Sequence, residues 1–318
     1  MRSLPAVLLA TCLMAAAAPT PKTAPPAHES FLSIPLWVEP ADTKLAATDL
    51  AAFVNNQPAT IVKLLTPESD LVLLMVLDLT GDLAFVQPAK ESLVAEIDKL
   101  PANTWVGLLN AQGGLSVLTD PTDDRPSVAA LIQSLPISGK AGLLDTLEPV
   151  ATLAGDVMRK ADVRVAVLYI TDSDVTNYRE DLTNPVINSS DPHDLSRRFP
   201  DSLIRERAAR LERQLAHTSA PVFIMHLQYR PSGLNQSYQS ALGTLAESTA
   251  GFAVFCRSTG AIPEEISNML SYIRSSYFVK LALPLKPAPA FQLRLEWKNE
   301  DKSQPHLAYR ARILVKQR

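Results

Sequence analysis

The chain has 318 residues, of which 47% are hydrophobic and 20% are charged, so its composition is that of a globular protein and excludes a disordered one. A formal net charge of −3 gives no electrostatic reason to expect binding to nucleic acid or to an anionic membrane. Glycine is scarce, with 11 residues against 25 prolines, which argues against glycine-rich phosphate-binding loops as a main feature.

Residues 1–18 are typical of a secretory signal peptide. Arg2 gives a basic start, Leu4–Met14 an apolar stretch, and the alanines at 15–17 small residues for cleavage. The apolar stretch is shorter than a typical membrane span, so we expect export to the periplasm or the medium and no span in the mature chain. Two alternatives stay open: a retained N-terminal anchor, and a lipoprotein with Cys12 as its lipid acceptor.

A linker and a β-rich segment follow. Residues 19–32 contain "PTPKTAPP", which favours an extended, proline-rich linker. Residues 33–66 are expected to be mainly β structure, with strands at Ser33–Glu39 and Ala59–Leu65 and a turn at residues 55–56. Between them, Asp49–Phe53 has the pattern of a short helical turn.

Residues 67–276 alternate between apolar runs and amphipathic stretches. The runs at Leu71–Leu77, Val163–Ile170 and Val222–Leu227 are typical of strands buried on both faces. Shorter strands are expected at 104–110, 114–119 and 252–256, and helices at 85–100, 127–135, 143–159, 202–216, 237–249 and 262–275. This alternation predicts an α/β domain with a doubly wound, mainly parallel sheet, in which ligands bind beyond the carboxyl ends of the strands.

Residues 277–318 return to β structure. "SYFVKLALPL", "FQLRLEW" and "LAYRARILVK" alternate between apolar and polar residues, which predicts an antiparallel meander that associates with the N-terminal β-rich segment. If Cys12 is lost with the signal peptide, Cys256 is the one remaining thiol, and its place in an apolar strand predicts a buried structural cysteine.

Acidic residues follow two of the buried strands. "LVLLMVLDLTGD" places Asp78, Thr80 and Asp82 at alternate positions where the first strand ends, and "VAVLYITDSD" places Asp172 and Asp174 at the end of the second. The carboxyl ends of parallel strands meet at one edge of a sheet, so these side chains are expected to lie close together. Carboxylate and hydroxyl oxygens are the ligands that Mg²⁺ prefers.

These motifs resemble the von Willebrand factor type A (vWA) domain, a Rossmann-like fold in which D-x-S-x-S, a later Thr and a (T/S)-D-G form a metal-ion-dependent adhesion site. "DLAAFVNNQPATIVKL" and "IRSSYFVKLALPLKPAPAFQLRLEW" are similar to flanking segments of the acidobacterial-type VWFA-related proteins. The resemblance covers about residues 35–316. It implies a protein or cell-surface ligand as partner, bound with help from a divalent cation.

The resemblance also implies roles for single residues. Asp78 takes the place of the first aspartate, Thr80 that of the first hydroxyl and Asp172 that of the final aspartate. Asp82 stands where the second serine belongs, and Ala141, in "SGKAGLLDTL", stands where the ligating threonine belongs. In addition, Ser173 replaces the usual glycine, so the site departs from the family pattern.

Three hypotheses about the site follow from these departures. Asp78, Thr80, Asp82 and Asp172 bind Mg²⁺, with water in place of the missing threonine; or the ammonium of Lys140 takes the position of the cation; or the residues are purely structural. Asp174 opens a long polar stretch, 174–202, which is expected to be a loop beside the site and contains His193. His226 ends an apolar strand and is expected to have a structural hydrogen bond.

We therefore expect an exported, non-catalytic binding module. The chain has no H-E-x-x-H, G-x-S-x-G or Walker motif and no Cys/His cluster, which disfavours an enzyme. The alternatives are a metal-dependent, phosphatase-like hydrolase and a scaffold with an inactive site. The sequence does not indicate the oligomeric state.

Overall fold

The structure is a computed structural model that describes residues 30–137, 140–174, 177, 200–283, 290–299 and 304–314. The predicted signal peptide (1–18), most of the predicted linker, His193 and most of the loop around it lie outside the described residues. Within the described ranges, every helix is too short or too polar to cross a lipid bilayer.

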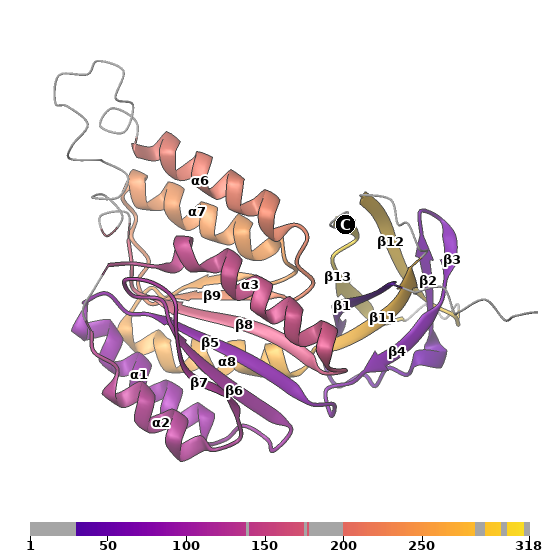
Figure 1. Cartoon of the computed structure of the whole chain (residues 1–318), viewed down its shortest axis with the longest axis horizontal. Coiled ribbons are helices and arrows are strands. Elements are labelled where there is room, and N and C mark those ends of the chain that lie inside the picture. Colours follow the sequence, from indigo (N-terminus) through magenta and orange to yellow (C-terminus); the bar gives the residue numbers. More distant parts are fainter. Residues whose placement is uncertain are drawn as a thin grey trace, which may run out of the picture.

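The centre of the molecule is a six-stranded sheet with the strand order β10-β9-β8-β5-β6-β7 (Figure 1). Neighbouring strands are parallel except at the edge, where β7 is antiparallel to β6. The strands are β5 (Leu71–Asp78), β6 (Thr104–Asn110), β7 (Ser116–Thr122), β8 (Arg164–Thr171), β9 (Val222–His226) and β10 (Ala253–Phe255). This arrangement confirms the predicted doubly wound, mainly parallel α/β sheet.

Helices cover both faces of this sheet. One face carries α1 (Leu83–Ile97), α2 (Arg125–Ser134) and α8 (Ile262–Arg274), and the other carries α3 (Leu143–Lys160), α6 (Pro200–Leu215) and α7 (Gly233–Glu247). Alternate residues of β5 point to opposite faces, so Leu73 and Met75 pack under the first group while Leu74 and Val76 pack under the second. All six helices lie where the sequence predicts them, within a few residues at each end.

A second unit is formed by the two ends of the chain. One of its sheets has the order β13-β1-β11-β4 and the other β14-β12-β2-β3, and apolar side chains from both enclose a separate core. The strands are β1 (Ser30–Glu39), β2 (Leu50–Val54), β3 (Gln57–Ala59), β4 (Ile61–Leu65), β11 (Tyr277–Leu283), β12 (Ala290–Trp297), β13 (His306–Tyr309) and β14 (Arg312–Leu314). We call this part the β unit.

Three details of the β unit differ from the sequence predictions. Strand β1 begins at Ser30, so the last residues of the predicted linker are strand. The predicted helical turn at 49–53 is wrong, because a 3-10 turn ends at Asp49 and β2 begins at Leu50, where pairing with β12 fixes an extended chain. The prediction of a C-terminal meander is also wrong. Strand β11 pairs with β1 and β12 pairs with β2, so these consecutive strands lie in different sheets.

The chain passes between the two units twice, between β4 and β5 and between α8 and β11, and a buried arginine holds both crossings. Arg164, the first residue of β8, donates from Nη2 to the carbonyls of Pro67 (2.6 Å) and Ser69 (2.8 Å) in the first crossing. Its Nη1 donates to the carbonyls of Arg274 (2.8 Å) and Ser276 (3.0 Å) in the second. Burial lowers the pKa of Arg164 to about 10, so it remains a cation at neutral pH.

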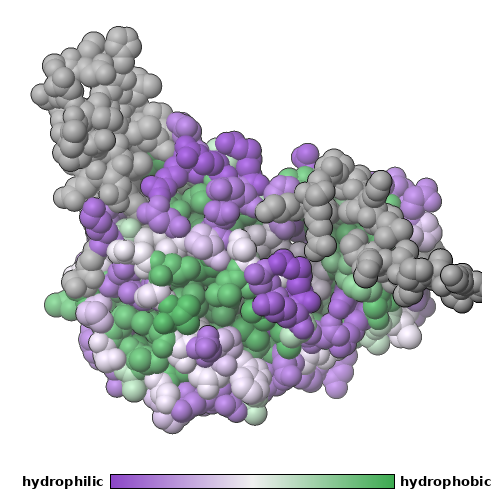
Figure 2. Space-filling model, viewed as in Figure 1, coloured by the Kyte–Doolittle hydropathy of each residue, from purple (hydrophilic) through white to green (hydrophobic). Residues whose placement is uncertain are grey.

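The antiparallel edge of the central sheet exposes apolar side chains. Trp105 of β6 and Val117 of β7 are both exposed, as is Leu115 in the turn between these strands. Figure 2 shows an apolar area on this face of the molecule, over the edge of the sheet. This edge is distinct from the carboxyl ends of the strands, where the acidic residues lie.

Candidate functional site

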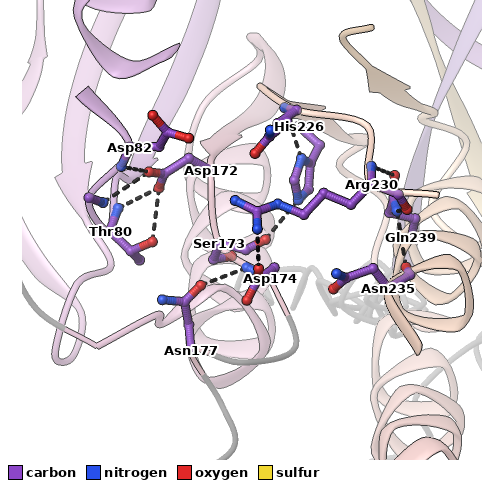
Figure 3. Close-up of polar contacts among 12 residues, drawn as sticks. Thr80, Asp82, Asp172, Ser173, Asp174, Asn177, His226, Arg230, Asn235 and Gln239 are labelled. Carbon is purple, nitrogen blue, oxygen red and sulfur yellow. Dashed lines mark hydrogen bonds and ion pairs between the residues drawn. The ribbon is translucent and has the colours of Figure 1, made fainter. Parts of the chain in front are cut away.

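The two acidic segments meet at the carboxyl ends of adjacent strands. Asp78 ends β5 and is paired in register with Thr171, the last residue of β8. The next residue, Asp172, reaches across to residues 80–82, which connect β5 to α1 (Figure 3). The structure thus brings together the side chains that the sequence predicts to be neighbours.

Asp78 is fully buried, and both of its carboxylate oxygens are hydrogen-bonded. Oδ1 accepts from the N–H of Gly142 (2.8 Å) and Oδ2 accepts from the hydroxyl of Thr171 (3.0 Å). The Thr171 hydroxyl also contacts that of Ser173 (2.6 Å), which in turn lies 3.2 Å from the hydroxyl of Tyr238. Burial raises the pKa of Asp78 to about 6, although these hydrogen bonds favour the charged form.

Asp172 accepts hydrogen bonds from three successive backbone N–H groups. Oδ1 accepts from the N–H of Thr80 and from its hydroxyl (3.1 Å), and Oδ2 accepts from the N–H groups of Gly81 (2.9 Å) and Asp82 (2.8 Å). Successive N–H groups that converge in this way form an anion-binding concavity. Gly81 has φ of 158°, a value that side-chain-bearing residues rarely adopt. We call these three N–H groups the amide nest.

The other two predicted ligand positions serve different purposes. Asp82 is the N-cap of α1, and its Oδ1 accepts a hydrogen bond from the N–H of Ala84 (3.2 Å). Ala141 is 3% exposed and presents a methyl group, so it supplies no oxygen. Asp82 therefore acts on the first turn of the helix in this structure.

The contacts described for Lys140 do not place its ammonium group between Asp78 and Asp172, and the hypothesis that it takes the position of the cation stays a prediction. Its side chain is exposed, and its backbone carbonyl accepts from the N–H of Gly113 (3.0 Å) in the turn between β6 and β7. Asp78 and Asp172 receive hydrogen bonds from backbone N–H groups instead.

Asp174 has a cationic partner that the sequence reasoning missed. Its Oδ2 lies 2.6 Å from Nη1 of Arg230, and its carboxylate is almost fully buried. Figure 3 shows the Arg230 side chain reaching from the segment after β9 toward Asp174. Gln239 holds the Arg230 backbone, donating to its carbonyl (2.7 Å) and accepting from its N–H (3.3 Å). The sequence could have indicated Arg230 by its position, because it follows β9, a third parallel strand that ends at the same edge of the sheet.

His226 and Cys256 are buried, and the His226 ring is hydrogen-bonded, as predicted. The His226 ring contacts the Ser173 carbonyl through Nε2 (2.7 Å) and accepts from the N–H of Gln228 at Nδ1 (3.2 Å), an arrangement that suits the neutral ring. Burial lowers the pKa of His226, which also favours the neutral form. Cys256 is buried, and burial raises the pKa of its thiol to about 12.

The residues at this edge do not fit a divalent cation in the arrangement found. Mg²⁺ requires about six oxygen ligands, yet the oxygens of Asp78 and Asp172 accept from N–H and O–H donors, and the Thr80 hydroxyl donates to Asp172. Among the described residues, no group of three or more His, Cys, Asp or Glu side chains is placed to hold a metal ion. The predicted Mg²⁺ site is therefore not formed by this geometry.

Two large apolar side chains are exposed on either side of the acidic residues. Leu83, the first residue of α1, is 64% exposed, and Tyr229, between β9 and Arg230, is 41% exposed. Leu83 follows β5 and Tyr229 follows β9, and β8 lies between these two strands in the sheet.

No family model and no curated protein matches the chain. Among solved structures, it is similar to a von Willebrand factor type A protein from Catenulispora acidiphila (12% identity, TM-score 0.44, covering 90% of this chain and 74% of that one). It is also similar to the conserved hypothetical protein BatB from Bacteroides thetaiotaomicron (14% identity, TM-score 0.39, 64% and 98% covered). A third is proximal thread matrix protein 1 from the mussel byssus with a zinc-occupied MIDAS motif (14% identity, TM-score 0.42, 74% and 50% covered).

The vWA resemblance seen in the sequence is thus found again among solved structures, at low identity. We take no function from these similarities. The fold assignment rests on the strand order and directions described above.

Proposed function

We propose that this protein is an exported, non-catalytic binding module, and that the carboxyl-end face of its central sheet binds another protein or a cell-surface ligand. The observation that supports this proposal most directly is the exposure of Leu83 and Tyr229 beside buried, fully hydrogen-bonded carboxylates. Exposed apolar surface marks interaction sites where it is contiguous, and we propose that one partner covers Leu83 and Tyr229 together.

The composition of this face suits a macromolecular partner. Tyrosine and arginine are enriched at protein interfaces, and here Tyr229 stands next to Arg230, whose guanidinium is partly exposed and anchored to Asp174. Leu83 adds an aliphatic contact at the start of α1. Because the hydrogen bonds below these side chains are already formed, little ordering is required on binding.

A capture experiment with matched variants tests the binding face. The mature chain is immobilised and exposed to the exported fraction of its own cells, with Leu83→Ser/Tyr229→Ser compared with the wild type. The control is Val62→Ser on β4, because Val62 is 48% exposed but belongs to the β unit. We expect a partner that the wild type and Val62→Ser capture equally and the double variant loses, with all three equally folded by circular dichroism. Equal capture by the double variant would contradict the proposal.

Export is tested separately. We expect the full-length chain in the exported fraction, and a chain lacking residues 1–18 in the cytoplasm. Detection of the shortened chain outside the cytoplasm would contradict the assignment of these residues as a signal peptide.

A further inference from the structure

We infer that the carboxyl-end site of this chain is liganded from within: the Asp172 carboxylate is the resident anion of the amide nest, and the N–H groups of the nest take the place of a divalent cation. The site then needs no metal to hold its shape. This inference concerns the interior of the site and does not depend on whether the face above it binds a partner.

First, the N–H groups of the nest and a metal ion would compete for the same carboxylate, that of Asp172. Both oxygens of Asp172 point at the nest, with Oδ2 accepting from Gly81 (2.9 Å) and Asp82 (2.8 Å) and Oδ1 from Thr80. The hydrogens of these donors carry positive partial charge, as a cation does. A metal ion bound to Asp172 from this side would have to displace the nest or lie against like charge.

The second step is the position of the nest at the start of a long helix. Helix α1 has 15 residues and begins at Leu83, directly after the nest, so its unpaired N–H groups and its dipole add to the positive potential there. An anion is stabilised at such a place. Asp172 supplies that anion from the neighbouring strand.

The third step is that the other candidate ligands are engaged as well. The two oxygens of Asp78 accept hydrogen bonds from Gly142 and Thr171, and the carboxylate of Asp82 caps α1. The side chain of Ala141 has no oxygen that could bind a metal. To form a metal site, several of these hydrogen bonds would have to break together. We therefore conclude that the hydrogen bonds between Asp172 and residues 80–82 fix the end of β8 to the β5–α1 connection.

The first experiment uses the wild-type mature chain. Mg²⁺, Mn²⁺ and Zn²⁺ are each titrated to millimolar concentration by calorimetry, and the melting temperature is compared with that in EDTA. We expect no saturable heat and no shift in melting temperature. Saturable binding that disappears in Asp172→Asn would overturn the inference.

The second experiment opens the nest. Asp172→Ala removes the resident carboxylate, so a small external carboxylate can take its place. We expect a lowered melting temperature that acetate or formate partly restores, compared with chloride at equal ionic strength. The matched control is Asp174→Ala, which removes an adjacent buried carboxylate that pairs with Arg230 instead of the nest. Equal responses of the two variants to acetate would contradict the nest as an anion site.

A conservative variant decides the matter if Asp172→Ala does not fold. Asp172→Asn keeps the shape but turns an NH₂ group toward the N–H donors, so we expect it to melt below the wild type and to remain insensitive to metals. A melting temperature equal to that of the wild type would show that the nest needs no anion. Loss of partner capture in the Leu83 and Tyr229 variants bears on the proposed function alone and leaves these outcomes unchanged.

Discussion

Buried charges lie at two opposite regions of the central domain, and each region is neutralised mainly by the backbone. At the carboxyl ends of the strands, the anion Asp172 is held by N–H groups. At the boundary with the β unit, the cation Arg164 is held by carbonyl oxygens. Neither contact is an ion pair, although Asp174 and Arg230 form one close to the first region.

The difference between the two regions follows from the direction of the chain. After a parallel strand the chain enters a helix, so helix N-termini with free N–H groups gather at the carboxyl ends, as at the start of α1. Helix C-termini with free carbonyls gather at the opposite ends, and the carbonyl of Arg274, the last residue of α8, accepts from Arg164. A doubly wound domain therefore provides anion sites at one edge and cation sites at the other.

The largest expected loss of stability concerns Arg164, the buried cation at the boundary with the β unit. Arg164→Met leaves the carbonyls of both crossings without their donor in a buried place, so we expect a loss of about 3–5 kcal/mol in the free energy of unfolding. Urea unfolding measures it. Arg164→Lys keeps the charge but loses the fork of donors, and a smaller loss is expected. A loss below about 1 kcal/mol in Arg164→Met would show that the crossings are held by other contacts.

The next effect concerns pH on the anion side. The folded protein raises the pKa of Asp78 to about 6 from its usual 3.8, so it holds this proton more tightly than the unfolded chain does. Asp78 therefore costs stability increasingly as pH rises from about 4 to about 6, by about 3 kcal/mol in all.

The measurement is urea unfolding from pH 4 to 7 on the wild type and on Asp78→Asn. Other carboxylates titrate in both proteins, so the difference isolates Asp78. We expect the wild type to lose stability relative to Asp78→Asn as pH rises. A constant difference across this range would contradict the raised pKa.

Arg310 tests the cation side again at a less enclosed position. It lies between β13 and β14, and its guanidinium donates to the carbonyl of Ser248, the C-cap of α7, and to that of Thr218 (3.0 Å). Because two carbonyls lose a donor instead of four, Arg310→Met should cost about 2 kcal/mol in urea unfolding. A cost as large as that of Arg164→Met would mean that the number of carbonyls does not set the effect.

The sequence predicts the central domain well because its signals are local. Continuous apolar runs such as Leu71–Leu77 match β5 closely, and helical periodicity predicts α1 and α8. The β unit is predicted less well, because β11 and β12 choose partners more than 200 residues away in sequence. Strand alternation reveals a strand but not the sheet to which it belongs.

The site is predicted in place but not in chemistry. The strand ends bring Asp78, Thr80 and Asp172 together as expected, yet a motif gives side chains and not the directions of backbone N–H groups. The amide nest consists of backbone atoms, so the residue letters of "DLTGD" do not show it, and Gly81 is its one trace in the sequence. Arg230 was missed because it lies beyond a third strand that carries no acidic motif.

The smallest expected effect distinguishes the two interpretations of Asp82. As an N-cap it bonds the N–H of Ala84 at the first turn of α1, a partly exposed place, so Asp82→Ala should cost about 1 kcal/mol in thermal unfolding. Asp82→Ser retains a capping oxygen and should recover most of this loss. If Asp82 were a metal ligand, Asp82→Ala would instead change the response to Mg²⁺. If Asp82→Ala lowers stability without changing the response to metal, both Asp82 and Asp172 are anions that stabilise the start of α1. Asp82 does so as the N-cap of the helix, and Asp172 does so from the end of the neighbouring strand β8.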